Sequence, residues 1–231
     1  MDAVIFDFDG VIIDSEPLHL AAYRAVLAPL GVQLDEQDYC ARYLGLNDRD
    51  CFEAVFADRG RAVPDLGPLI ASKAILVRQG LAHVAAMPGA CELIRQLAAA
   101  SVPVGICSGA LRDEILLPLR ALGIASCIAD IVSTEDVRRG KPDPEGYALS
   151  LLRLGRNVGR PLTPSRVVVV EDAPPGIAAA AAIGMPVLAV TNSYGAAALG
   201  AAQRIVASLA DITLADLDVW LHGRRREEHR P

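Results

Sequence analysis

Two aspartates separated by one residue follow a short apolar run near the N-terminus. Residues 4–6 (Val-Ile-Phe) precede Asp7 and Asp9, and Gly10 follows. Residues two apart on an extended segment point the same way, so both carboxylates can face one ligand. Acids that only filled space beside so many apolar residues would be costly. The pattern therefore favours chemistry at this pair. The simpler alternative is a pair of solvated turn acids, with Asp14 as the N-cap of the next helix.

Other polar residues stand where further predicted strands end, or in a loop near them. They are Ser108 and Gly109 after a strand over 102–107, Lys141 in a loop with two prolines, and Glu171 and Asp172 after four valines. Taken singly, a serine-glycine pair is a common turn, and a loop lysine is usually only solvated. Because ligands bind beyond the carboxyl ends of strands in open α/β sheets, we expect all these groups to meet at one edge. Their joint occurrence indicates a single site.

The elements that must position these residues alternate between strand and helix after residue 89. Helices are predicted over 90–100, 112–122 (with Pro118 expected to kink or shorten it), 145–154, 175–183 and 215–221, and strands over 102–107, 128–132, 166–170, 186–190 and 205–206. Such alternation predicts a parallel, Rossmann-like sheet with right-handed crossovers, flanked by helices. Residues 15–83 contain only helical patterns, over 16–30, 36–44, 48–59 and 67–81, and form a small all-helical insert after the first strand. We therefore expect an α/β core of residues 1–14 and 84–222, and a charged tail of residues 223–231.

The composition is that of a globular protein with a sizeable core. The chain has 231 residues, of which 52% are hydrophobic and 22% charged. Its net charge of -6 argues against a nucleic-acid or anionic-membrane partner. It does not exclude an anionic substrate, because one Mg²⁺ can reverse the local field. No apolar run is long enough to span a membrane, and no signal peptide precedes the first strand, so we expect a cytoplasmic protein. The cysteines lack CxxC spacing and are expected to be reduced and mostly buried: Cys40, Cys51, Cys91, Cys107 and Cys127.

These residues and their spacing resemble the haloacid dehalogenase-like superfamily, in its phosphatase and phosphomutase branch. The match is carried by Asp7-Phe8-Asp9-Gly10, Ser108, Lys141 in Gly-Lys-Pro-Asp-Pro, and Glu171-Asp172 followed by Gly176 and Ile183-Gly184. The resemblance covers nearly the whole chain, and the helical insert is similar to the family's mobile cap. Residues 14–19 (Asp-Ser-Glu-Pro-Leu-His) resemble the signature of the β-phosphoglucomutase-like group.

The resemblance implies phosphoryl transfer through a covalent intermediate on Asp7, which would be the nucleophile. Asp9 would be the general acid–base, and Lys141 would neutralise Asp7 and the transferring phosphoryl group. Ser108 and the backbone N–H of Gly109 would bind the phosphoryl oxygens.

The resemblance also implies a Mg²⁺ cofactor. Its ligands would be the Asp7 side chain, the Asp9 backbone carbonyl, and the acids Glu171 and Asp172, which are hard oxygen donors of the kind that Mg²⁺ prefers. We expect Asp172 to be the main ligand from the second acid pair, with Glu171 assisting directly or through water. In the superfamily's dehalogenases and phosphonate hydrolases the second acid is replaced, so the presence of Asp9 favours phosphate esters.

Three basic residues are candidates for contact with the rest of the substrate. His19 matches a family position near the entrance of the site, but a histidine on a helix surface is the simpler interpretation. Arg49 lies in the insert, and Arg112 begins the helix that follows Ser108. Each of these arginines has a solvated side chain as its simpler interpretation.

Three hypotheses for function follow, of which a Mg²⁺-dependent phosphatase acting on a small phosphorylated metabolite, such as a sugar phosphate, is favoured. A sugar phosphomutase is the alternative, but Leu44 and Asp48 stand where mutases carry a lysine and an arginine, and Ala110-Leu111 replaces a polar and a basic residue. A non-enzymatic phospho-acceptor, such as a response-regulator receiver domain, is the third. Receivers are about half as long and lack the insert. Because the built-in cap can cover the site without a partner chain, we expect a monomer.

Overall fold

The computed structural model describes residues 1–44 and 46–228 and forms two compact units. The first, called the core unit, comprises residues 1–14 and the chain from residue 85 onward. The second, called the helical unit, comprises residues 15–84, so the division at its end lies one residue beyond the predicted boundary. Among the described helices, none combines the length and the apolar character needed to cross a membrane.

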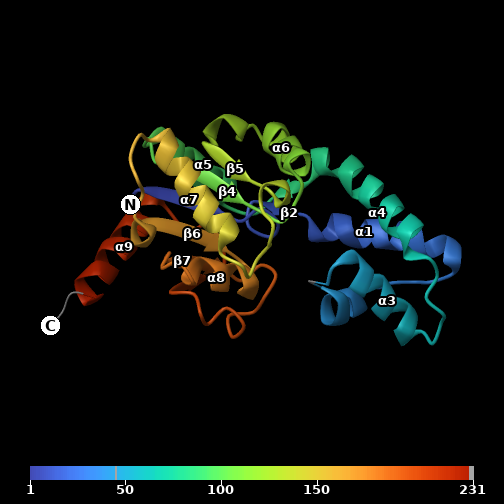
Figure 1. The fold of residues 1–231 in the computed structure, drawn as a ribbon. Coiled ribbons are helices and arrows are strands. Elements are labelled where there is room, and N and C mark those ends of the chain that lie inside the picture. The colour runs from blue at the N-terminus through green and yellow to red at the C-terminus, as the bar shows by residue number, and fades with distance from the viewer. Residues whose placement is uncertain (45, 229–231) are drawn as a thin grey trace. The chain divides into compact units, whose positions relative to one another are not determined.

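The core unit is built on a parallel sheet with the strand order β5-β4-β1-β6-β7-β8 (Figure 1). Its strands are β1 (Ala3–Phe6), β4 (Val104–Cys107), β5 (Asp130–Val132), β6 (Val167–Glu171), β7 (Val187–Val190) and β8 (Arg204–Val206). The predicted parallel α/β core is confirmed. Strands β1 and β6 lie side by side at its centre and are buried throughout, as their uninterrupted apolar sequences require.

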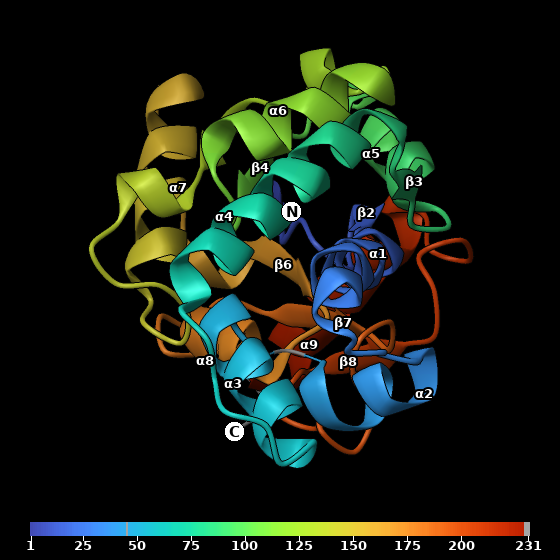
Figure 2. The ribbon, with the colours of Figure 1, turned by 90° about the vertical axis from the view of Figure 1, so that its right-hand side faces the viewer.

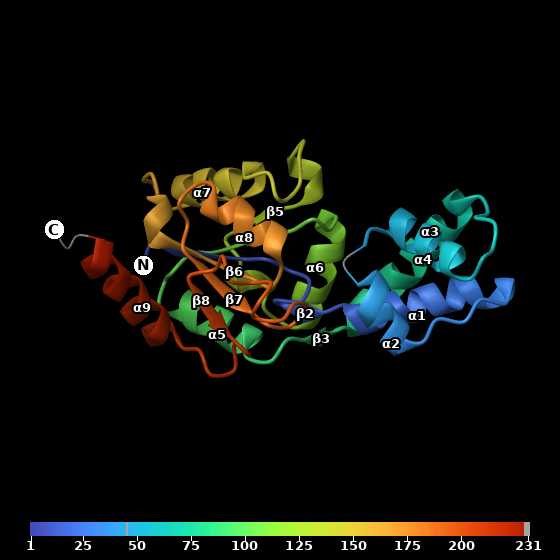
Figure 3. The same ribbon diagram turned by 90° about the horizontal axis from the view of Figure 1, so that it is seen from below.

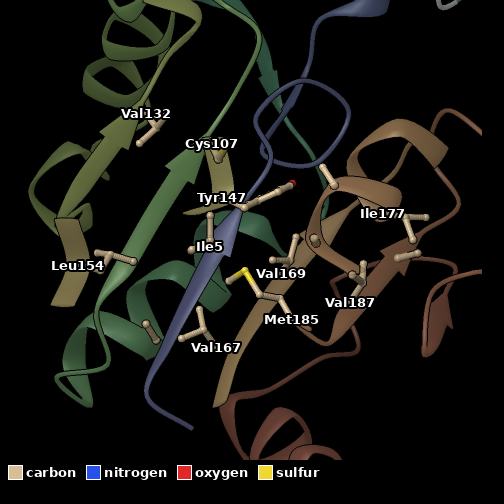
Figure 4. Packing of buried hydrophobic residues seen from close by; sticks show 14 of the residues in the cluster. Ile5, Cys107, Val132, Tyr147, Leu154, Val167, Val169, Ile177, Met185 and Val187 are labelled. Carbon is tan, nitrogen blue, oxygen red and sulfur yellow. The ribbon is translucent and has the colours of Figure 1, made fainter. Parts of the chain in front are cut away.

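Helices cover both faces of this sheet (Figure 3). They are α5 (Ala90–Ala99), α6 (Arg112–Ala121), α7 (Glu145–Asn157), α8 (Pro174–Ala181) and α9 (Leu214–Glu228). Helices α7 and α8 pack on the face that presents Ile5, Val169 and Val187, where Tyr147 and Ile177 fill the interface (Figure 4). Helix α5 lies against β4 and contacts α9. Short 3₁₀ turns complete the chain at Ala28–Leu30, Leu81–His83, Ala125–Cys127, Thr134–Asp136 and Pro164–Arg166.

Three details of the core unit differ from the predictions. Strands β2 (Ile13–Asp14) and β3 (Ala85–Ala86), which were not predicted, pair antiparallel (Figure 2). Asp14 is therefore part of a strand and does not cap a helix. Helix α6 continues through Pro118 to Ala121, so this proline does not end it. Helix α9 runs to Glu228, seven residues beyond its predicted end, because the Arg- and Glu-rich sequence that we expected as a tail consists of good helix formers. The rest of the predicted tail, residues 229–231, lies outside the described residues.

The helical unit has its own apolar core. Its helices are α1 (Glu16–Leu27), α2 (Glu36–Asp38), α3 (Asp48–Asp58) and α4 (Leu66–Gly80), with a π-helical segment at Tyr39–Tyr43 where one longer helix was predicted. Helix α4 lies along α1 (Figure 1). Tyr23 packs edge-on against Phe52, with ring centres 5.1 Å apart. Gly45, in the loop before α3, lies outside the described residues.

Candidate active site

The carboxyl ends of β1, β4 and β6 bring the predicted site residues to one edge of the sheet. Phe6 is in register with Ile106 of β4 and with Val170 of β6, so Asp7 lies level with Glu171. The amide of Asp7 donates a hydrogen bond to the carbonyl oxygen of Val170 over 2.9 Å. This bond extends the pairing of β1 with β6 by one residue beyond Phe6. Asp7 is therefore held by the rigid sheet.

Lys141 joins the acids of β1 and β6. Its Nζ donates hydrogen bonds to Oδ1 of Asp7 and to Oε1 of Glu171, each over 2.7 Å. It also lies 5.2 Å from the centre of the Tyr147 ring. Burial would lower the pKa of Lys141, but the charges of Asp7 and Glu171 outweigh it and raise that pKa well above its usual value. The lysine is therefore a permanent cation within the acid cluster.

The Glu171 carboxylate is fully buried and accepts four hydrogen bonds. Its Oε1 accepts from Lys141 and, over 3.0 Å, from the hydroxyl of Tyr147, and its Oε2 accepts from the backbone amides of Asp172 and Ala173, each over 2.9 Å. These bonds fix the side chain and satisfy both oxygens. Glu171 is thus a rigid anionic support for Lys141 and for the start of α8.

Asp7, Glu171 and Asp172 form a group of carboxylates that could hold a metal ion. One oxygen of each lies within 4.8 Å of one oxygen of each of the others. Burial raises the pKa of Asp7 to about 8, with the charge of Lys141 opposing and that of Glu171 adding to the effect. Burial also raises the pKa of Asp172 to about 6; the hydrogen bond from Ser193 opposes this and the charge of Glu171 adds to it. These three acids lie close together, and Lys141 is the cation that the structure places among them. Their carboxylates are hard oxygen donors, so the group fits a small divalent cation.

Asp9 and Gly10 lie in the turn that follows β1. Gly10 has φ of +72°, and a β-carbon there would lie 2.0 Å from Oδ2 of Asp172. Only glycine allows this approach of the turn to the acid cluster. Asp9 is half-buried, and its charge adds to the rise of the Asp172 pKa, so it acts electrostatically on the same cluster.

Ser108 and Gly109 lie at the end of β4. The amide of Ser108 donates to the carbonyl oxygen of Val132 over 3.0 Å, and its hydroxyl oxygen accepts from the amide of Ala110 over 3.0 Å. These two residues and Lys141 line one cavity of about 220 Å³. The structure thus brings the buried serine, the exposed glycine and the lysine around one space at the sheet edge.

The candidate substrate residues have other partners in the structure. In the helical unit, Nδ1 of His19 lies 2.7 Å from Nζ of Lys73, and Arg49 is exposed and pairs with Glu53 over 3.9 Å. In the core unit, Arg112 donates to Oδ2 of Asp136 over 2.6 Å and to the carbonyl oxygen of Ile131 over 2.9 Å.

Sequence reasoning missed three residues that contact the group of Asp7, Glu171 and Asp172 or the Gly10 turn beside it. Tyr147 binds Glu171, as described, and Ser193 donates to Asp172. Asn192 donates through Nδ2 to the carbonyl oxygen of Gly10 over 2.6 Å. Asn192 and Ser193 could have been found from the sequence, because they come shortly after the apolar strand β7, as Ser108 comes directly after β4. Tyr147 carried no such signal, since a helical tyrosine is most often a core residue.

Comparison with known proteins identifies the family. Residues 1–184 match the haloacid dehalogenase-like hydrolases. The chain belongs to this family. The predicted resemblance is thereby confirmed, and so is the prediction of an enzyme.

Relatives of this haloacid dehalogenase-like hydrolase include phosphatases and a mutase. Validoxylamine A 7'-phosphate phosphatase from Streptomyces hygroscopicus subsp. limoneus is 31% identical over 209 residues, which cover 90% of this chain and 94% of that protein. β-Phosphoglucomutase from Bacillus subtilis (strain 168) is 28% identical over 238 residues, covering 98% of this chain and 99% of that protein. The crystal structure of a family hydrolase from Deinococcus radiodurans R1, with bound phosphate and sodium, has a TM-score of 0.78 at 29% identity and covers 96% and 97% of the two chains. This haloacid dehalogenase-like hydrolase therefore has both phosphatases and a β-phosphoglucomutase among its relatives.

Proposed function

We propose that the protein is a Mg²⁺-dependent phosphatase that hydrolyses a small phosphorylated metabolite through an aspartyl-phosphate on Asp7. The observation that carries this proposal is the group of three carboxylates with Lys141, at the same sheet edge as Ser108. It combines a nucleophile, a cation beside it and donors for a phosphoryl group. The substrate class is proposed as a sugar phosphate or a related phosphorylated polyol, supported by the validoxylamine A 7'-phosphate phosphatase and the β-phosphoglucomutase among its relatives.

In the first step, an Asp7 carboxylate oxygen would attack phosphorus while the bond to the substrate's ester oxygen breaks. Asp9 would give its proton to that leaving oxygen, which departs as an alcohol. The hydroxyl of Ser108, the amide of Gly109 and the ammonium group of Lys141 would hold the phosphoryl oxygens. Since a carboxylate and a phosphate repel each other by about 4 kcal/mol per charge pair at ~4 Å and an effective dielectric of ~20, nearby cations are essential.

In the second step, water would attack phosphorus and lose a proton to Asp9 while the bond between phosphorus and Asp7 breaks. Inorganic phosphate leaves, and both aspartates regain their starting states. Asp9 thus acts as acid and then as base.

The residues that would hold Mg²⁺ are Asp7, Asp172, the backbone carbonyl of Asp9, and Glu171 through water. Both oxygens of Glu171 already accept two hydrogen bonds each, which supports Asp172 as the direct ligand of the second acid pair. When bound, the ion would supply positive charge against the phosphoryl oxygens and the nucleophile.

The test is phosphate release from a panel of phosphorylated metabolites, measured with Mg²⁺ and with chelator, for the wild type and for Asp7→Asn. We expect release on at least one substrate, lost with chelator and reduced by at least about three orders of magnitude in the variant. Release that survives in Asp7→Asn would overturn the proposed nucleophile.

The sugar phosphomutase remains the second candidate, because the Bacillus subtilis mutase aligns over almost the whole chain. It would isomerise a 1-phosphosugar and would need a bisphosphate primer. The same samples, examined for isomerised sugar phosphate with and without primer, separate the two activities. A phosphorylated Asp7 that persists for minutes without turnover would instead favour the phospho-acceptor.

His19, Arg49 and Arg112 remain predicted contacts to the substrate's non-transferred part. A monomeric state and a cytoplasmic location likewise stay predictions.

A further inference from the structure

We propose that Ser193 and Asn192 are positioning residues of the acid cluster, which hold Asp172 and the Gly10 turn in the arrangement that receives Mg²⁺. The proposal rests on the metal dependence of the proposed function and adds two residues that belong to none of its chemical steps. All the residues concerned belong to the core unit.

Strand β7 carries these residues to the same sheet edge as the acids. Ala189 of β7 is in register with Glu171 of β6, so the segment after β7 emerges beside Asp172. The amide of Thr191 donates to the carbonyl oxygen of Val206 over 3.1 Å, which extends the pairing with β8 to the start of this segment. Asn192 and Ser193 therefore begin from a fixed backbone.

Ser193 fixes the carboxylate of Asp172. Its hydroxyl donates a hydrogen bond to Oδ2 of Asp172, a residue that is only 3% exposed. A carboxylate held at one oxygen cannot rotate freely about its terminal bond, so Oδ1 keeps one direction in which to meet a cation. Hydrogen bonds to ligating carboxylates orient metal ligands in this way, and their loss typically weakens metal binding 10- to 100-fold.

Asn192 fixes the turn that faces the same carboxylate. Its side-chain amide donates to the carbonyl oxygen of Gly10 over 2.6 Å. A β-carbon at Gly10 would lie 2.8 Å from Oγ of Ser193 as well as 2.0 Å from Oδ2 of Asp172, so turn, serine and acid are in direct contact. Because Asp9 immediately precedes Gly10, the amide also limits where the turn can place Asp9.

The first experiment measures Mg²⁺ binding by titration calorimetry with MgCl₂ alone, for the wild type, Ser193→Ala and Ser193→Thr. We expect Ser193→Ala to bind Mg²⁺ at least about tenfold more weakly, and Ser193→Thr, which keeps a hydroxyl, to retain most of the affinity. At saturating Mg²⁺, kcat with p-nitrophenyl phosphate should recover to within about threefold of the wild type. Ser208→Ala is the matched control, since Ser208 is also half-buried and donates its hydroxyl to a backbone oxygen elsewhere in the core unit.

The second experiment uses Asn192→Asp, which keeps the shape of the side chain but removes the donor to Gly10. We expect a fall in kcat of about tenfold that saturating Mg²⁺ does not restore, because the turn beside Asp9 is loosened. Asn157→Asp is its control, since Asn157 is also exposed and its amide donates to the carbonyl oxygen of Ala129 over 3.0 Å. Melting curves without Mg²⁺ establish that each variant is folded.

Wild-type Mg²⁺ affinity in folded Ser193→Ala would overturn the role of Ser193, and an unchanged kcat in Asn192→Asp would overturn that of Asn192. In both cases the phosphatase proposal would stand. Failure of the wild type itself to bind Mg²⁺ would overturn this proposal together with the metal dependence of the proposed function.

Discussion

A β-carbon on Gly176 would lie 1.5 Å from Oε1 of Glu171. The first turn of α8 therefore packs directly against the carboxylate that supports Lys141. This close approach gives the glycine after the second acid pair a physical role: it leaves space for a buried side chain that accepts four hydrogen bonds.

We predict that Gly176→Ala displaces Glu171 and weakens the whole cluster. The carboxylate cannot move without losing bonds to Lys141, to Tyr147 or to the two backbone amides just before α8, so the free energy of unfolding should fall by about 1–3 kcal/mol. Phosphate release should fall with it. The control is Gly200→Ala, where the nearest atom would be 3.6 Å away. Equal melting temperatures for the two variants would contradict the prediction.

We predict that Lys141→Met destabilises the metal-free protein. The substitution leaves the carboxylates of Asp7 and Glu171, which are 14% and 0% exposed, without their shared cation. Because removing one partner strands a buried charge, the free energy of unfolding at pH 8 should fall by about 2–4 kcal/mol. Denaturant unfolding measures this change. Adding Asp7→Asn to Lys141→Met should recover part of the loss, and a purely additive double variant would argue against the coupling.

The free energy of unfolding at acid pH should depend on Asp2, which lies just before β1. Burial would raise the pKa of Asp2, but the hydrogen bonds and charges of Arg166 and Arg160 outweigh it and lower that pKa to about 2 from its usual 3.8. A lowered folded-state pKa stabilises the protein above about pH 4, and this stabilisation is lost as the pH falls toward 2. Both arginines are partly exposed, so we expect a contribution of about 1 kcal/mol. Unfolding curves of Asp2→Asn should therefore approach those of the wild type near pH 2, whereas exposed Asp211→Asn should match the wild type throughout.

Arg112 and Arg153 have the same hydrogen-bond partners, so Arg153 serves as a control in a test of Arg112 as a substrate contact. Both donate to the carboxylate of Asp136, over 2.6 and 2.8 Å, and both donate to the carbonyl oxygen of Ile131. Replacing either with alanine should lower stability similarly, by about 1 kcal/mol. Only Arg112→Ala should also raise KM, by about 3- to 10-fold, if one substrate-facing bond is lost. Equal KM values for both variants would remove Arg112 from the substrate contacts.

The sequence alone determined the main strands and helices of the core unit and the strand ends at which we predicted chemistry. Runs such as the four valines before Glu171 are typical of strands buried on both faces, and polar residues placed directly after such strands lie at the carboxyl edge of the sheet. The order of the acid pair, serine, lysine and second acid pair therefore predicted one site, its family and its nucleophile. These are local properties, since periodicity and residue type act within a few positions.

Only the tertiary structure decided which side chains meet within that site. Lys141 binds Asp7, which lies 134 residues earlier in the chain. The hydroxyl of Tyr147, on α7, donates to Glu171. The side chain of Asn192, just after β7, donates to the backbone of Gly10. The β2–β3 pair likewise joins two short segments that carry no strand pattern of their own. Such contacts depend on strand register and on the path of each loop, which arise from packing of the whole core. A short stretch of sequence specifies neither the strand register nor the loop path, so these contacts could be identified only from the folded structure.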